Sequence, residues 1–275
     1  MAPKTVFITG ANRGIGLGIV RELLKIPEIE TVIAGVRNLE AAKLKNGESF
    51  EVFTKYCCDS RLQLISVDVS NDESLANSVK QVQILVGDHG LNLLINNAGV
   101  IEVYHTKDAP KRAPILRCID VNAVSALLAS QAIIDLFKIR VTFEFQHFLP
   151  LLQKAAALTQ GDELSANRAA IINIGSDCSS QTLNVTGFCN EALVAYKMSN
   201  VAMLCFARSL VADFKTLNIP VLVTTIHPGW VLTDMGGPNA DITVEESASK
   251  IVNSISHLNS THNGGLFDRQ LTAMP

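Results

Sequence analysis

The chain has 275 residues, 48% of them hydrophobic, and a formal net charge of -3. This length supports one substantial core, so we expect a single domain over residues 1–275. A sequence pI of about 6.1 gives no basic surface for nucleic acid or anionic lipid, and a small soluble ligand is the expected partner. The six cysteines show neither CxxC spacing nor a nearby histidine pair, which argues against a metal site and a disulfide framework.

The N-terminal residues run straight into a strand pattern, which leaves no room for a signal peptide. No uninterrupted apolar run approaches the ~18 residues of a membrane span. We therefore expect a cytoplasmic location and no membrane partner.

Short apolar runs rich in β-branched residues alternate with longer amphipathic stretches. The runs are TVFITG, TVIAGV, LQLISV, LNLLIN, AAIINIG and VLVTTI, a composition typical of parallel strands buried on both faces. Helical spacing of apolar residues is found over 15–25, 71–86 and 195–217. Right-handed crossovers then predict a Rossmann-type α/β fold. Its doubly wound parallel sheet lies in three α/β/α layers, with ligands bound beyond the carboxyl ends of the strands.

A glycine-rich turn, TGANRGIG, follows the first predicted strand and places Gly10, Gly14 and Gly16 before the first helix. Glycine there lets the backbone approach a pyrophosphate, whose charge is met by amide groups and by the dipole of the helix N-terminus. A tight strand-to-helix turn also needs glycine for its geometry alone, so this motif by itself leaves a structural role open.

The second predicted strand ends at Val36 and Arg37, where NAD-binding folds carry a carboxylate for the adenosine ribose. A guanidinium at this place, joined by Arg13 of the glycine turn, suits the 2′-phosphate of NADP. We therefore expect NADP(H) to be preferred over NAD(H). Two alternatives stay open: Arg37 as a solvated surface cation, and NAD as the cofactor.

Further motifs in the same order resemble the short-chain dehydrogenase/reductase family from about residue 4 onward. They are VDVS, NNAG at 96–99, DVN, NIGS, and HPGWVLTDM at 227–235. The ending, MGGPNADITVEES followed by GGLFD, is similar to the carbonyl-reductase-like subgroup of the C-factor and Sniffer type. The resemblance implies a homodimer or homotetramer and cofactor contacts by Gly10, Asn12, Arg13, Gly14, Ile15, Gly16, Arg37, Asp68, Val69, Asn96, Asn97, Ala98, Gly99, Tyr196, Asn200, Pro228, Gly229, Val231 and Thr233.

Three of the family's four catalytic positions are matched, by Asn122, Ser176 and Tyr196. The resemblance implies that Tyr196 donates the proton, that Ser176 orients the carbonyl and that Asn122 holds a water in a proton path. Without the family context, Tyr196 reads as a core tyrosine on an amphipathic helix and Asn122 as a structural hydrogen-bonding residue.

The fourth catalytic position is a lysine in the family, but here it is Asn200, and Lys197 lies one residue after the tyrosine. On a helix, position i+4 shares the face of Tyr196, whereas i+1 points about 100° away. We therefore expect that Lys197 does not replace the missing cation. Losing a charge-assisted contribution of a few kcal/mol predicts turnover slower by roughly two to four orders of magnitude.

Two functions follow from these residues. The leading hypothesis is an NADP(H)-dependent oxidoreductase that transfers a hydride between nicotinamide and a small carbonyl or secondary alcohol, weakened by Asn200. The alternative is a catalytically impaired NADP(H)-binding protein with a regulatory or structural role.

One segment, residues 133–147, interrupts the resemblance. It alternates apolar and polar residues from Ile139 to Gln146, a strand period inside a helical context. We expect either a bulge displaced from the helix, offering an exposed strand edge, or an artefact of gene prediction. Native peptides that cover VTFEFQHFLPLL in mass spectrometry would exclude the artefact.

Overall fold

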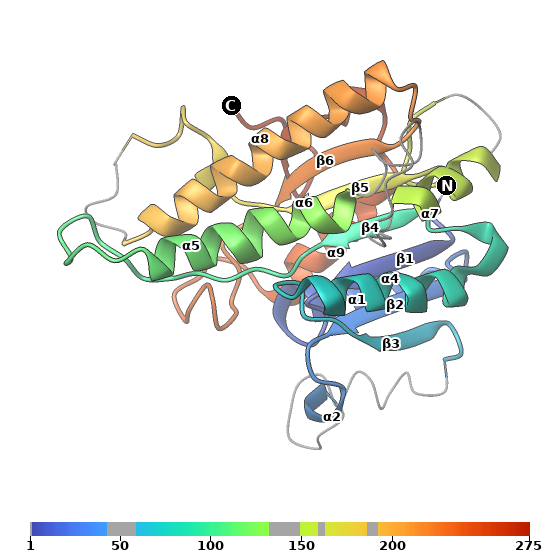
Figure 1. Cartoon of the computed structure of the whole chain (residues 1–275), viewed down its shortest axis with the longest axis horizontal. Coiled ribbons are helices and arrows are strands. Elements are labelled where there is room, and N and C mark those ends of the chain that lie inside the picture. Colours follow the sequence, from blue (N-terminus) through green and yellow to red (C-terminus); the bar gives the residue numbers. More distant parts are fainter. Residues whose placement is uncertain (1, 43–58, 132–148, 159–162, 186–191) are drawn as a thin grey trace.

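The computed structural model describes residues 2–42, 59–131, 149–158, 163–185 and 192–275. Segment 133–147, and the interpretations placed on it, therefore lie outside the described residues. In the part that is described, seven parallel strands form one sheet with the order β3-β2-β1-β4-β5-β6-β7 (Figure 1). The Rossmann-type doubly wound sheet expected from the sequence is confirmed.

The strands correspond to the apolar runs of the sequence. Their bounds are β1 Thr5–Thr9, β2 Thr31–Val36, β3 Leu62–Ser66, β4 Leu93–Asn96, β5 Ala170–Ile174, β6 Leu222–His227 and β7 Leu266–Asp268. The helices are α1 Gly14–Leu23, α2 Leu39–Ala42, α4 Asp72–Val86, α5 Ala113–Ile119, α6 Ser125–Ser130, α7 Leu149–Leu158, α8 Val194–Thr216 and α9 Val244–Ile255. Short helical turns are η1 Gly87–His89, η2 Asp120–Val124, η4 Asp177–Ser179 and η5 Ser260–His262.

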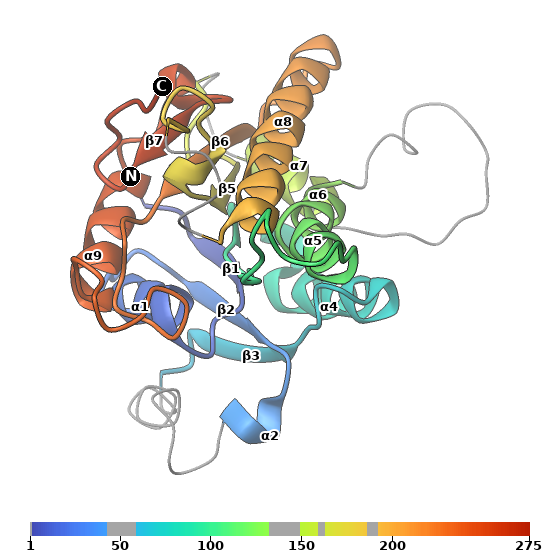
Figure 2. The same cartoon turned by 90° about the vertical axis from the view of Figure 1, so that its left-hand side faces the viewer.

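Two cores cover the two faces of the sheet, because side chains alternate along each strand. On β1, Phe7 belongs to the core under α4, α6 and α8, whereas Val6 and Ile8 belong to the core under α1 and α9. Figure 2 shows these two helical layers on opposite sides of the sheet. All carboxyl ends of the strands therefore open on one edge, at which the predicted motifs come together.

A continuous helix from Ala113 to Ser130 joins α5, the π-helical turn η2 and α6. By length and mean hydropathy alone, this helix could cross a membrane. The sequence did not indicate this, because polar residues interrupt its apolar runs. The helix also carries Arg117 and Asp120 and packs along α8, with Ala123 in the core. Its apolar residues are therefore explained by packing within the fold.

Candidate active site

The glycine turn is interlocked with the segment that follows β4. A Cβ atom on Gly10, whose φ is +65°, would lie 2.9 Å from the Cα of Ala98, and one on Gly16 would lie 2.4 Å from Asn97 Nδ2. Asn97 Nδ2 donates hydrogen bonds to the carbonyl oxygens of Thr9 at 2.9 Å and Gly10 at 3.0 Å. The glycines are thus needed for close approach, and Asn97 supports the turn.

The N-terminus of α1 carries free donors toward this turn. The helix starts at Gly14, with φ of +52°, after an extended Arg13. Among the described residues no side chain caps it and no acidic residue lies in its first turn. By contrast, Asn71 and Thr243 cap α4 and α9, which also carry carboxylates in their first turns. The first amide groups of α1 are therefore available to a phosphate.

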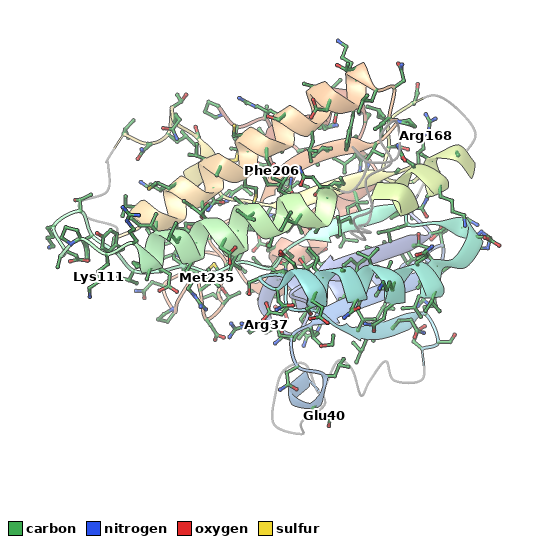
Figure 3. All side chains as sticks on the ribbon, viewed as in Figure 1. Arg37, Glu40, Lys111, Arg168, Phe206 and Met235 are labelled. Carbon is green, nitrogen blue, oxygen red and sulfur yellow. The ribbon has the colours of Figure 1, made fainter. Side chains whose placement is uncertain are left out.

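Arg37 and Asp68 lie near each other where β2 and β3 end. Hydrogen bonds from Ser70 lower the pKa of Asp68, burial opposes this, and the charges of Arg37 and Arg117 add to the lowering. Arg37 is exposed at the end of the sheet where α1 begins (Figure 3). The other predicted cofactor residues lie after β1, β3 and β4 on the same edge: Asn12 and Ile15, Val69, and Gly99.

The second guanidinium, that of Arg13, is already paired. Its Nη1 lies 2.6 Å from Asp234 Oδ2, and both side chains are mostly exposed. A Cβ on Gly14 would lie 3.2 Å from Thr233 Cγ2. The loop after β6 thus contacts the glycine turn, and a phosphate at Arg13 would compete with Asp234 for the guanidinium charge.

That loop is compact and closes on itself. Leu232 N donates to the carbonyl of Ile242 at 2.9 Å, which pairs the two ends of the loop. Pro228 O accepts a hydrogen bond from Ser247 Oγ at 2.7 Å, Gly229 has φ of +87°, and Val231 is buried. The predicted nicotinamide contacts are therefore held in a defined conformation beside the glycine turn.

Asn96 differs from the other predicted cofactor residues. Its buried side chain donates to Asn173 Oδ1 at 2.9 Å and to Ser130 Oγ at 3.1 Å. These bonds join β4, β5 and α6 in the interior. The structure therefore does not bring the Asn96 side chain to the nucleotide groove.

Tyr196 and Ser176 come together at the carboxyl edge of β5, where the first turn of α8 begins. The Tyr196 phenol is hydrogen-bonded to Ser176 and to Asn200. Burial raises the pKa of Tyr196 to about 12, with additional raising by Cys178 and Asp177, while the two hydrogen bonds act in the opposite direction. The phenol is therefore protonated at neutral pH.

The contacts that the structure describes for Asn200 and Lys197 place no positive charge at this phenol. Asn200 Nδ2 donates to the backbone carbonyl of Tyr196 at 3.0 Å. Lys197 is 7% exposed, and its Nζ donates to Asn184 Oδ1 at 3.1 Å in the segment after β5. The lysine thus anchors that segment to α8.

Asn122 lies in the π-helical turn η2, a type of turn found often at functional sites. Its Oδ1 accepts from Val100 N at 2.8 Å, and its Nδ2 donates to Val100 O and to Ser199 Oγ, each at 2.9 Å. Both donor hydrogens of the amide are therefore engaged. The geometry is that of the structural hydrogen-bonding residue considered from the sequence, which ties the segment after β4 to α8.

Asp177 is a site residue that the sequence reasoning missed. Its Oδ1 accepts the hydroxyl proton of Ser176 at 2.8 Å, and its backbone N donates to His227 Nδ1 at 3.2 Å. Burial lowers the pKa of His227, and the charge of Asp177 opposes that shift. Its position directly after Ser176 is the feature of the sequence that could have identified Asp177 as a site residue.

A hollow of about 550 Å³ is lined by the segment after β4 and by the first turns of α5. Its lining includes Tyr104 and the ion pair in which Arg117 Nε lies 2.8 Å from Glu102 Oε1. Tyr104 pairs with Leu193, just before α8. The hollow contains none of the predicted catalytic residues, so it does not by itself mark the reactive centre.

The family model described as short chain dehydrogenase matches residues 4–142. The chain belongs to this family. Sniffer of Caenorhabditis elegans is 38% identical with a TM-score of 0.83, covering 100% of this chain and 99% of that one. The carbonyl reductase Sniffer of D. melanogaster is 30% identical with a TM-score of 0.85, covering 99% of each chain. An NADPH-bound carbonyl reductase from chicken fatty liver is 29% identical with a TM-score of 0.83, covering 100% of this chain and 99% of that one.

These relatives confirm the carbonyl-reductase-like resemblance given by the C-terminal motifs. The protein is therefore an oxidoreductase-family member with a nicotinamide-binding fold.

Proposed function

We propose that this protein is an NADP(H)-dependent reductase that converts a small carbonyl compound to an alcohol. The observation that carries the proposal is the hydrogen-bonded pair of Tyr196 and Ser176 at the edge where the uncapped α1 begins. A phenol and a hydroxyl that converge on one point are the two groups that a carbonyl oxygen needs as it gains negative charge.

The residues of the groove suit a phosphorylated dinucleotide. The free amide groups of α1 would hold the pyrophosphate, and Arg37, with Arg13 once it leaves Asp234, would hold a 2′-phosphate. Val231 and Thr233 would contact the nicotinamide. When bound, NADPH supplies the hydride.

The protonation of Tyr196 favours reduction over oxidation. With a pKa of about 12, the phenol holds its proton at neutral pH and gives it to the carbonyl oxygen as the carbon becomes an alcohol carbon. In the reverse direction a phenolate must accept the proton, and its population at neutral pH falls tenfold for each unit by which the pKa rises. Reduction is therefore the proposed direction.

The rival function is an impaired NADP(H)-binding protein, and a specific observation favours it. Asn200 occupies the place of a cation and turns its amide back to Tyr196 O, while Lys197 is held by Asn184. Neither contact places a positive charge at the phenol to offset the burial of a phenolate. Nucleotide binding is compatible with both functions, so turnover has to distinguish them.

The test is the substitution Asn200→Lys. A cation about 4–5 Å from the phenol oxygen contributes about 3–4 kcal/mol at an effective dielectric constant near 20, so carbonyl reduction should rise by about two to three orders of magnitude. Asn200→Met is the matched control, because it adds length without charge. NADPH oxidation is followed by absorbance across aldehydes, ketones and quinones, and NADPH affinity by calorimetry.

Two results would count against the proposal. If Asn200→Lys folds and binds NADPH but reduces no carbonyl in the panel, the binding function replaces the reductase. If well-folded wild-type protein binds neither NADPH nor NADH, both functions fail.

The cytoplasmic location, the single domain over 1–275 and the homodimer or homotetramer stay predictions. Sedimentation equilibrium of the purified chain would measure its assembly.

A further inference from the structure

The Ser176 hydroxyl has one proton to donate and three neighbours with which it forms hydrogen bonds. The proton goes to Asp177 Oδ1 at 2.8 Å, Cys178 N donates to Ser176 Oγ at 3.1 Å, and Tyr196 completes the set. A carboxylate is a stronger acceptor than a neutral phenol, because charge-assisted hydrogen bonds are about twice as strong as neutral ones. The single Ser176 proton is therefore contested by two acceptors, the Asp177 carboxylate and the Tyr196 phenol oxygen, and the carboxylate is the stronger of the two.

We propose that Asp177 is a positioning residue that holds the proton of Ser176, and thereby decides whether Ser176 can donate a hydrogen bond to Tyr196 or to a substrate carbonyl. This role rests on the proposed reductase function. Asp177 itself acts through Ser176 and need not touch the substrate.

The consequence for chemistry is direct. A carbonyl oxygen that becomes an alkoxide needs donors, and a hydroxyl that faces it with lone pairs repels it. While Asp177 holds the Ser176 proton, that proton is not donated to the carbonyl oxygen or to the phenolate that Tyr196 leaves. The carboxylate thus slows the same step that the absence of a lysine at position 200 slows.

Other charged and titratable groups near the Tyr196 phenol also influence its ionisation. On the turn η4 they are Asp177 and Cys178, which both raise the pKa of Tyr196. At the end of β6, His227 accepts from the backbone N of Asp177, with Asp268 and Arg269 near the imidazole. On α8, Lys197 Nζ lies at Asn184. Asp177 is therefore the carboxylate that contacts Ser176 directly.

The experiment uses the full chain labelled with a fluorinated tyrosine, whose phenol ionises in a milder pH range, and follows it by fluorine NMR. The chain has three tyrosines, and Tyr196→Phe assigns the signal. In Asp177→Asn a neutral amide oxygen holds the serine proton less strongly than the carboxylate does, so the ionisation midpoint of residue 196 should fall by about one pH unit. Asp213→Asn, an exposed carboxylate on α8, should leave it unchanged.

A double-mutant cycle tests whether the effect passes through the hydroxyl. In a Ser176→Ala background, Asp177→Asn should move the midpoint by less than about half as much, because the two residues are coupled. In an Asn200→Lys background, it should raise kcat for carbonyl reduction by about tenfold, and leave the dissociation constant of NADPH unchanged.

The NMR titration needs no cofactor, so it separates this role from the reductase function. An unchanged midpoint in Asp177→Asn, or an equal shift with and without Ser176, overturns the positioning role even if the protein proves to be a reductase. A shifted midpoint with no turnover in any variant keeps the role of Asp177 in holding the proton and rejects the reductase. Asp177→Ala provides the same comparison if Asp177→Asn does not fold.

Discussion

The pair formed by Arg13 and Asp234 leads to a quantitative prediction for nucleotide binding. The two atoms are 2.6 Å apart, but the side chains are 60% and 77% exposed, so the pair contributes about 0.2–1 kcal/mol, as exposed ion pairs do. In the proposed complex, Asp234 competes with the 2′-phosphate of NADPH for the charge of Arg13. Asp234→Asn removes that competition and should tighten NADPH binding by about 1.4-fold to fivefold.

Calorimetry with NADPH and NADH measures this effect. NADH lacks the 2′-phosphate, so its dissociation constant should stay the same in Asp234→Asn. Asp241→Asn is the matched control, because Asp241 is an exposed carboxylate of the same loop. The difference between variant and wild type should shrink toward 1 M salt, where the screening length is about 3 Å. Equal tightening of both nucleotides, or weaker NADPH binding, would refute the assignment of Arg13 to the phosphate.

Two further predictions concern stability. Gly16→Ala would place a Cβ 2.4 Å from Asn97 Nδ2 and 2.5 Å from Gly10 O, so we expect a loss of about 1–3 kcal/mol in denaturant unfolding and weaker NADPH binding by calorimetry; an unchanged variant would show that the turn is loosely packed. Burial lowers the pKa of His227, so the unfolded chain binds the proton more readily and stability should fall as pH drops below about 6.5. His227→Asn should flatten that dependence in chemical denaturation at several pH values, and an unaltered slope would assign it to other groups.

Local patterns in the sequence were sufficient to predict the strands of the sheet and which residues of α8 share a face. The apolar runs predict β1 to β6 because buried parallel strands need continuous apolar residues. Helical geometry predicts that Tyr196 and Asn200 share a face while Lys197 does not, and the Lys197 side chain indeed bonds Asn184. Strand β7 has three residues, too few for a periodic signal.

Contacts between distant residues could not be predicted in this way. The partners Arg13 and Asp234 are 221 positions apart, and Asn122 and Ser199 are 77 apart. These residues meet only in the folded protein, so the spacing of residues within one helix or strand cannot predict their contacts. Asn96 belongs to a motif that resembles a cofactor contact, yet its side chain is drawn inward because β5 offers it Asn173.

The loop between β6 and α9, which contacts the glycine turn, contains an intrinsic fluorophore. The chain contains one tryptophan, Trp230, which is 51% exposed and donates from Nε1 to Gly236 O at 2.8 Å across this loop. Intrinsic indole emission therefore comes from this loop alone, without any attached dye. If NADPH binds as proposed, with its nicotinamide beside Val231, binding should quench this emission, and stopped-flow recordings of the signal would give the rate of binding.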